Sequence, residues 1–70
     1  MAQKVDYEYM YERWEYLLTD EEKKNETKDT IKDFFETMRW MAEGTGTEEE
    51  NLTDEQINNI VDYIIERNKA

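Results

Sequence analysis

The chain has 70 residues and a formal net charge of −10, and it contains neither cysteine nor histidine. It therefore has no disulfide and no thiolate metal site, and it lacks the commonest general base and the commonest transition-metal ligand. This composition argues against a metalloenzyme and against hydrolases built on Ser-His-Asp or Cys-His groups. We expect one domain over residues 1–70, near the lower size limit for a single hydrophobic core.

The first predicted element is a helix over about residues 4–18. Its large apolar residues recur every three or four positions, which places them on one face of a helix and does not fit the alternation of a strand. We expect this face to pack into the core. The stripe consists of Tyr7, Met10, Tyr11, Trp14, Leu17 and Leu18.

The second predicted helix covers about residues 20–43. Its apolar stripe has the same helical spacing, and Gly44 directly after it suits the left-handed conformation in which many helices end. We therefore expect this helix to end at about residue 43. The stripe consists of Ile31, Phe34, Phe35, Met38, Met41 and Ala42.

Two interpretations are open for the start of the second helix, because residues 20–30 contain no large apolar side chain. One is a long helix capped at Thr19, and the other is a loop followed by a shorter helix capped near Asn25 or Thr27. We favour the long helix because the segment has neither proline nor glycine, and because Glu22 follows Thr19 at the spacing of a capping box.

The third predicted helix covers about residues 53–68, with Thr53 as its N-cap. Gln56 has the spacing to complete a capping box with Thr53. Leu52 and Ile57 have the spacing of a hydrophobic staple. Three amphipathic helices predict an all-α fold, a compact three-helix bundle with an aromatic-rich core. The apolar stripe of the third helix consists of Ile57, Ile60, Val61, Ile64 and Ile65.

The negative charge is concentrated in two segments. Residues 5–22 hold seven acidic residues and one arginine, and residues 44–56 hold five acidic residues and no basic one. Nucleic acid and anionic membranes repel such a chain, whereas basic protein surfaces attract it. A simpler interpretation is that the acidity keeps a small protein soluble. The sequence leaves open whether the two segments share one face.

Several aromatic residues break the amphipathic pattern. At about 100° per residue, Trp40 points away from the apolar stripe of the second helix, toward its charged face. On the first helix Val5, Tyr9 and Tyr16 form a second stripe. Tyr63 points away from the isoleucines of the third helix. Three interpretations are open: rings that fold over the rim of a small core, burial in a homodimer, or anchors for a partner protein.

The sequence favours a binding protein over an enzyme. Its carboxylates lie mostly on helix faces predicted to be exposed, and neither acidic segment has the spacing of an EF-hand calcium loop. A glycine-rich phosphate loop and basic patches for nucleic acid are both missing. We therefore expect no enzymatic activity, no cofactor, no metal and no direct contact with nucleic acid or membrane. The N-terminal segment does not resemble a signal peptide, so we expect a cytoplasmic protein, in the host cytoplasm if it is phage-encoded.

The preferred functional hypothesis is a small acidic inhibitor that occupies a basic, nucleic-acid-accommodating surface of a larger protein. Carboxylates spaced along helices can take the place of backbone phosphates, and exposed aromatic rings can anchor the contact. In size, acidity and lack of catalytic groups, the chain is similar in character to small phage-encoded anti-restriction and anti-CRISPR proteins, although it carries no family motif. The alternatives are a homodimeric structural or assembly module and an antitoxin-like regulatory subunit. The candidate partner-binding residues are Glu8, Tyr9, Glu12, Glu15, Tyr16 and Trp40, with Asp20, Glu21, Glu22, Glu48, Glu49 and Glu50 supplying electrostatic steering.

Overall fold

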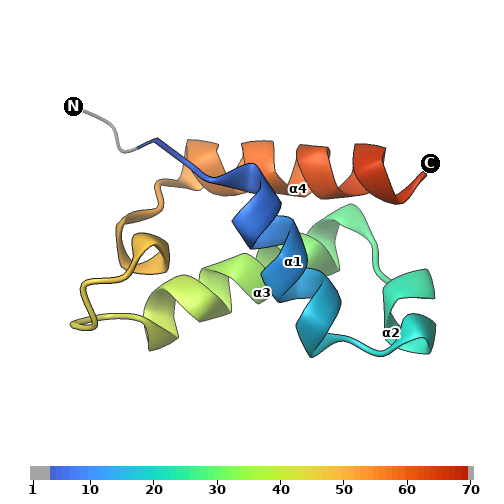
Figure 1. Cartoon of the computed structure of the whole chain (residues 1–70), viewed down its shortest axis with the longest axis horizontal. Helices are drawn as coiled ribbons and strands as arrows, with labels where there is room; N and C mark the ends of the chain where they lie inside the picture. The colour runs from blue at the N-terminus through green and yellow to red at the C-terminus, as the bar shows by residue number, and fades with distance from the viewer. Residues whose placement is uncertain (1–3, 70) are drawn as a thin grey trace.

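A computed structural model describes residues 4–69 of the chain, and this part is helical without any β-strand (Figure 1). The predicted all-α class is confirmed, with three main helices, one short helix and one 3-10 turn. The elements are α1 (Tyr7–Leu17), α2 (Asp20–Lys24), α3 (Lys28–Met41), the 3-10 turn η1 (Glu48–Asn51) and α4 (Asp54–Asn68).

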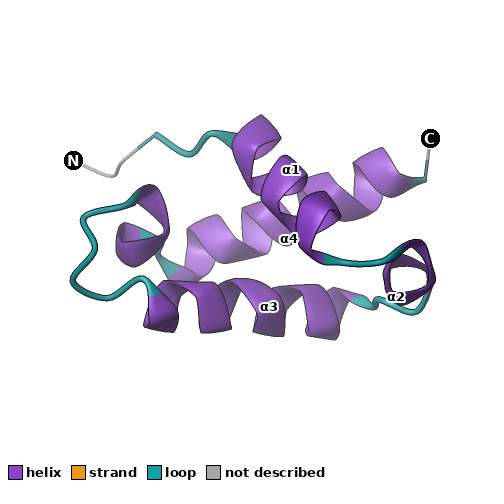
Figure 2. Ribbon diagram, turned by 60° about the horizontal axis from the view of Figure 1, so that its bottom comes forward, coloured by secondary structure: helices purple, strands orange, loops and turns teal. Residues whose placement is uncertain are grey.

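Two antiparallel helices, α3 and α4, run along the long axis of the molecule, and α1 lies obliquely across them (Figures 1 and 2). The molecule measures 34 × 20 × 19 Å along its principal axes. In Figure 1, α2 lies at one end of the long axis and η1 at the other. The acidic residues of these two elements are therefore at opposite ends of the molecule.

The core lies where the apolar stripes of the three main helices meet. Trp14 of α1, Phe35 of α3 and Ile60 of α4 are completely buried, and Leu52 closes the core ahead of α4. Burial of these large side chains is the main force that holds so small a fold together. The buried apolar residues are Met10, Tyr11, Trp14, Ile31, Phe35, Leu52, Ile57, Ile60, Val61 and Ile64.

Two residues predicted to face the core are largely exposed. Leu17 at the end of α1 is 51% exposed, and Met41 at the end of α3 is 69% exposed. Both lie on the apolar stripe of their helix, but α1 makes few close contacts with α3, because both helices pack against α4 instead. The stripes thus extend beyond the area that the neighbouring helices cover.

The predicted long second helix is wrong, because the chain breaks between α2 and α3. Thr19 caps α2 through a capping box with Glu22, as its spacing predicted. A second box then follows, in which the side chains of Thr27 and Thr30 exchange hydrogen bonds with each other's backbone N–H. Since residues 20–30 contribute no large apolar side chain to the core, local caps decide the backbone path there.

The other helix ends follow the expected chemistry. The Thr53 side chain accepts a hydrogen bond from the Gln56 N–H, and the Gln56 side chain accepts one from the Thr53 N–H, so the predicted capping box of α4 is present. α1 begins at Tyr7 with Asp6 as its N-cap, about one turn later than predicted. Gly44 has a φ of +82°, in the left-handed region that favours glycine, just after α3 ends at Met41.

Candidate partner-binding surface

The outer side of α1 carries the most exposed of the predicted contact residues. Glu12, Glu15 and Tyr16 line one shallow hollow together with Tyr9 and Arg13. Tyr16 is 85% exposed, and both glutamates are exposed as well. The helical spacing of these residues brings them to the same side of α1. The sequence hypothesis that this side of α1 displays aromatic and acidic groups together agrees with the observed geometry.

The acidic display continues into α2. Asp20 and Glu21 lie in the first turn of α2, which begins three residues after α1 ends, and both are exposed. Asp20 forms an ion pair with Lys23 at 3.4 Å, a surface contact that contributes little to stability. We call Glu12, Glu15, Tyr16, Asp20 and Glu21 the acidic α1–α2 surface.

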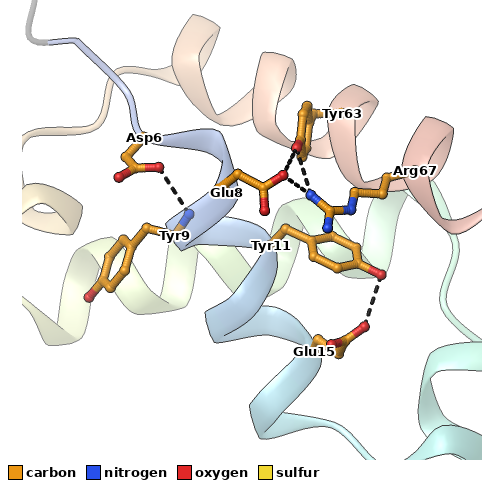
Figure 3. Close-up of polar contacts among 7 residues, drawn as sticks. All are labelled: Asp6, Glu8, Tyr9, Tyr11, Glu15, Tyr63 and Arg67. Carbon is orange, nitrogen blue, oxygen red and sulfur yellow. Dashed lines mark hydrogen bonds and ion pairs between the residues drawn. The ribbon is translucent and has the colours of Figure 1, made fainter.

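Glu22 and Glu8 have structural partners. The Glu22 carboxylate accepts the Thr19 N–H at 2.9 Å, and this hydrogen bond holds the pKa of Glu22 below its usual value. Glu8 pairs with Arg67 of α4, and its Oε1 also accepts a hydrogen bond from the Tyr63 hydroxyl at 2.7 Å (Figure 3). These two carboxylates therefore stabilise a helix start and a helix contact.

The contact around Arg67 joins α1 to α4. The guanidinium lies over the ring of Tyr11, 4.4 Å from its centroid, and donates to the Tyr63 hydroxyl at 2.9 Å. Tyr63 in turn stacks on Tyr7 with 5.5 Å between the ring centroids. The predicted outward Tyr63 thus packs over the rim of the core, and the half-buried Val5 also packs against that core.

Tyr11 also ties the core to the acidic α1–α2 surface. Its hydroxyl donates to Oε2 of Glu15 at 2.9 Å, as Figure 3 shows. Burial of the Tyr11 ring and this hydrogen bond to the Glu15 carboxylate both raise the pKa of the tyrosine. Glu15 is thus held in place while it remains exposed.

The three glutamates of η1 are engaged within the molecule. Glu48 accepts the backbone N–H of Asp6 at 2.8 Å. Glu50 accepts the backbone N–H groups of Gly44 and Gly46, and so closes the loop after α3. Glu49 is buried, with 4% of its surface exposed. Glu48 therefore joins η1 to the residue before α1, Glu50 stabilises the α3–η1 loop, and Glu49 is not part of the exposed acidic surface.

Glu49 is a buried carboxylate with mixed surroundings. Burial by itself raises its pKa, but hydrogen bonding to its own backbone N–H, to Tyr9 and to Thr47, together with the Arg13 charge, outweighs burial and lowers it. Hydrogen bonding to Glu49, and then burial, raise the pKa of Tyr9. Within residues 4–69 the Glu49 Oε1 atom has no close hydrogen-bond partner. The carboxylate is therefore incompletely satisfied.

Trp40 lies in a different hollow from the acidic α1–α2 surface. It is 74% exposed on α3, beside Glu36, Arg39, Glu43 and Glu50. The Arg39 guanidinium donates to the Leu52 carbonyl and to Asp54, so it is occupied in joining α3 to the start of α4. The expected exposure of Trp40 is observed, but the two hollows share no lining residue.

A large concavity between α1 and α3 was not foreseen from the sequence. It is an open groove of about 830 Å³ between α1 and α3, mostly apolar, and of the predicted contact residues it contains Tyr9 and Glu49. The sequence showed only that the apolar stripes reach Leu17 and Met41 at the helix ends, and the structure adds that both residues are exposed there. The lining residues are Tyr9, Arg13, Leu17, Thr30, Asp33, Phe34, Thr37, Met38, Met41, Ala42, Thr45, Thr47 and Glu49.

Comparison with protein-family models, with curated proteins and with solved structures finds no significant match to this chain. Over residues 4–69, no helix is both long and apolar enough to cross a membrane. In the same part of the chain, acidic side chains do not gather in a group suited to hold a metal ion.

Proposed function

We propose that this protein is a small acidic inhibitor that binds a basic, nucleic-acid-accommodating surface of a larger protein through the acidic α1–α2 surface. One observation carries the proposal: Glu12, Glu15 and Tyr16 line a single exposed hollow on α1, and the exposed carboxylates of Asp20 and Glu21 follow at the start of α2. This surface offers negative charge and an aromatic anchor side by side.

The acidic excess gives this surface a long-range attraction for cations. The chain has 19 acidic and nine basic residues. Several of the basic side chains pair with carboxylates elsewhere in the described part of the chain, as Lys28 does with Asp62 and Arg67 with Glu8. Arg13 is the basic residue that lines the α1 hollow. The resulting negative field accelerates encounter with a positive surface and weakens as salt is added.

The geometry also suits replacement of a nucleic-acid backbone. Glu12 and Glu15 are about one helical turn apart, so their carboxylates follow each other along one side of α1. The Tyr16 ring loses little conformational entropy when it is covered, which favours it as an anchor. The protein would therefore compete with DNA or RNA for its partner, and its affinity would fall steeply with ionic strength.

The test compares two charge-reversed variants with equal net charge. The first is Glu12→Lys/Glu15→Lys/Glu21→Lys, within the acidic α1–α2 surface; Glu8 is left unchanged because a lysine there would face Arg67. The second is Glu43→Lys/Glu55→Lys/Glu66→Lys, at exposed positions outside that surface. Each triple substitution reverses three of the 19 acidic residues against the same background. Circular dichroism serves as the control that both variants remain helical.

Each protein is immobilised and used to capture proteins from a nuclease-treated bacterial lysate, with and without added duplex DNA. We expect the wild type to retain nucleic-acid-binding proteins that the duplex displaces, the first variant to lose at least about tenfold of this capture, and the second to keep most of it. Equal loss in both variants would attribute binding to net charge and reject the proposed surface. A stable wild-type dimer in light scattering, with no displaceable capture, would favour the assembly module instead.

A further inference from the structure

The groove between α1 and α3 has the shape of a helix-binding groove. Tyr9, Arg13 and Leu17, each four residues from the next, form its α1 wall. On α3, Phe34 and Met38 have the same spacing. Residues four apart follow one line along a helix, so each wall is a continuous strip of side chains. The groove is open because α1 and α3 both pack on α4 and make few close contacts with each other (Figure 2).

Large apolar side chains in this groove remain uncovered. Leu17 is 51% exposed and Met41 is 69% exposed, while Phe34 and Met38 are partly buried against the core beneath. Apolar surface that gathers in a concave strip is typical of a binding site, and methionine adapts its shape to a partner's side chains. The groove therefore offers apolar contact along most of its length.

One end of the groove holds a buried carboxylate that keeps one oxygen without a hydrogen-bond partner. Glu49 lines the groove beside Thr45 and Thr47 at the C-terminal end of α3. Its side chain is 4% exposed, and its Oε1 atom has no close hydrogen-bond partner within residues 4–69. A carboxylate oxygen in this position is satisfied best by an ammonium or guanidinium group. This end of the groove therefore favours an occupant that carries a cationic group.

The required chemistry narrows the possible occupants. A second copy of this chain, a fatty acid or a nucleic acid would bring further negative charge to a chain whose net charge is already −10. An extended peptide that binds as an added strand needs an open sheet edge, and residues 4–69 contain no strand. A helix satisfies its own backbone hydrogen bonds and needs contacts from its side chains only. A helix with an apolar face and basic residues matches both features of the groove.

We propose that the α1–α3 groove binds an amphipathic, cationic helix of another protein, whose apolar side chains pack against Leu17, Phe34, Met38 and Met41 and whose lysine or arginine pairs with Glu49. From Thr30 to Met41 the groove wall extends about 16 Å, at the rise of an α-helix. The bound segment is therefore about three turns long, with apolar residues at i, i+4 and i+7 and a cation one turn further on. The groove shares Tyr9 and Arg13 with the α1 hollow but contains none of the five residues of the acidic α1–α2 surface, so the proposal stands whether or not that surface binds a basic protein.

The probes are three fluorescein-labelled peptides of 18 residues. The first carries leucines at helical spacing with lysines at both ends of the stripe, the second has the same composition in a scrambled order without an apolar face, and the third has the leucine stripe with every lysine replaced by glutamate. Fluorescence anisotropy at physiological salt measures binding. We expect the first peptide to bind the wild type at least about tenfold more tightly than either of the others. Equal binding of the first two would overturn the proposal.

Methionine methyl NMR locates the contact. Met38 and Met41 line the groove, whereas Met10 is completely buried in the core. We expect the first peptide to shift the ε-methyl signals of Met38 and Met41 and to leave that of Met10 in place. Binding that leaves Met38 and Met41 unchanged would place the peptide elsewhere and reject the groove.

Substitutions test the two features separately. Leu17→Asp/Met41→Asp removes exposed apolar contact and should weaken the first peptide at least about tenfold, whereas Trp40→Ala, outside the groove, should leave its affinity unchanged. A version of the peptide with both end lysines replaced by norleucine should lose affinity for the wild type but not for Glu49→Gln. Equal losses in the two proteins would show that Glu49 does not receive the cation. The Glu12→Lys/Glu15→Lys/Glu21→Lys variant should keep the methyl shifts of Met38 and Met41, which distinguishes this site from the acidic α1–α2 surface.

Discussion

The two sides of α1 differ in how many of their side chains make contacts within the molecule. Toward α4, Tyr7 stacks on Tyr63, and Glu8 and Tyr11 both hold Arg67, so aromatic rings and an ion pair seal the contact. Toward α3, Leu17 remains half exposed beside an open groove. Both sides contain apolar and charged residues, yet one is packed against α4 and the other borders an open groove.

Exposure and charge by themselves therefore do not identify a binding residue. Glu8 and Glu12 are both exposed glutamates one turn apart on α1. Glu8 pairs with Arg67, and its loss would loosen α1 from α4. Glu12 lies in the open hollow of the acidic α1–α2 surface. The partner that a carboxylate already has within the molecule decides whether it is available to another protein.

Among the expected changes in stability, the largest difference is between substitutions of Trp14 and Leu17 on the same helix. Trp14 is completely buried, so Trp14→Ala should destabilise the fold by about 3–5 kcal/mol. Leu17→Ala removes a half-exposed side chain and should change stability by less than about 1 kcal/mol. Urea unfolding followed by circular dichroism measures both. Similar losses would mean that the groove is covered in the free protein.

A smaller effect contrasts the arginines on the two sides of α1. Arg67→Ala removes the ion pair with Glu8 and the cation–π contact with Tyr11, and should cost about 1–2 kcal/mol. Arg13→Ala, on the open side, should cost less than about 0.5 kcal/mol. Thermal unfolding at low salt compares the two variants. If Arg13→Ala proved the more damaging, the open side would hold more of the fold's stability than its geometry indicates.

The smallest expected effect concerns the pH dependence contributed by Glu49. Its pKa is lowered in the folded protein, so its charged form favours folding above the ordinary value of about 4.5, and this contribution is lost as the pH falls through the folded pKa. Glu49→Gln should therefore be less stable than the wild type at pH 7, by less than about 1 kcal/mol, and the gap should narrow by pH 3. Urea unfolding at both pH values measures it. Glu12→Gln, at an exposed residue, is the control. A stability difference between the wild type and Glu49→Gln that widens on acidification would contradict the lowered pKa of Glu49.

The helices and most of the core could be predicted from the sequence, because capping boxes and apolar spacing are local patterns. The Thr53–Gln56 capping box predicted the start of α4, and apolar spacing predicted which face of each main helix contains core residues. The break before α3 was missed because its box uses Thr30 in place of the usual Glu or Gln, and because no apolar side chain anchors residues 20–30.

The candidate sites depended on contacts between distant parts of the chain, which helical spacing does not describe. Glu49 and Tyr9 are 40 positions apart, yet their interaction in the fold raises the pKa of the tyrosine. The pairing of Glu8 with Arg67 joins the two ends of the described chain in the same way. Spacing predicted that Tyr16 and Trp40 are exposed. The groove between α1 and α3 depends on the oblique course of α1 in the fold, which spacing does not describe.

The two tryptophans have opposite environments, and this gives the protein a pair of internal optical reporters. Trp14 is shielded from solvent, whereas Trp40 is 74% exposed and is surrounded by Glu36, Glu43 and Glu50. An anionic quencher such as iodide is repelled from this neighbourhood, while caesium is attracted to it. Quenching by caesium therefore follows events at the outer face of α3, and the blue-shifted emission that remains follows the integrity of the core.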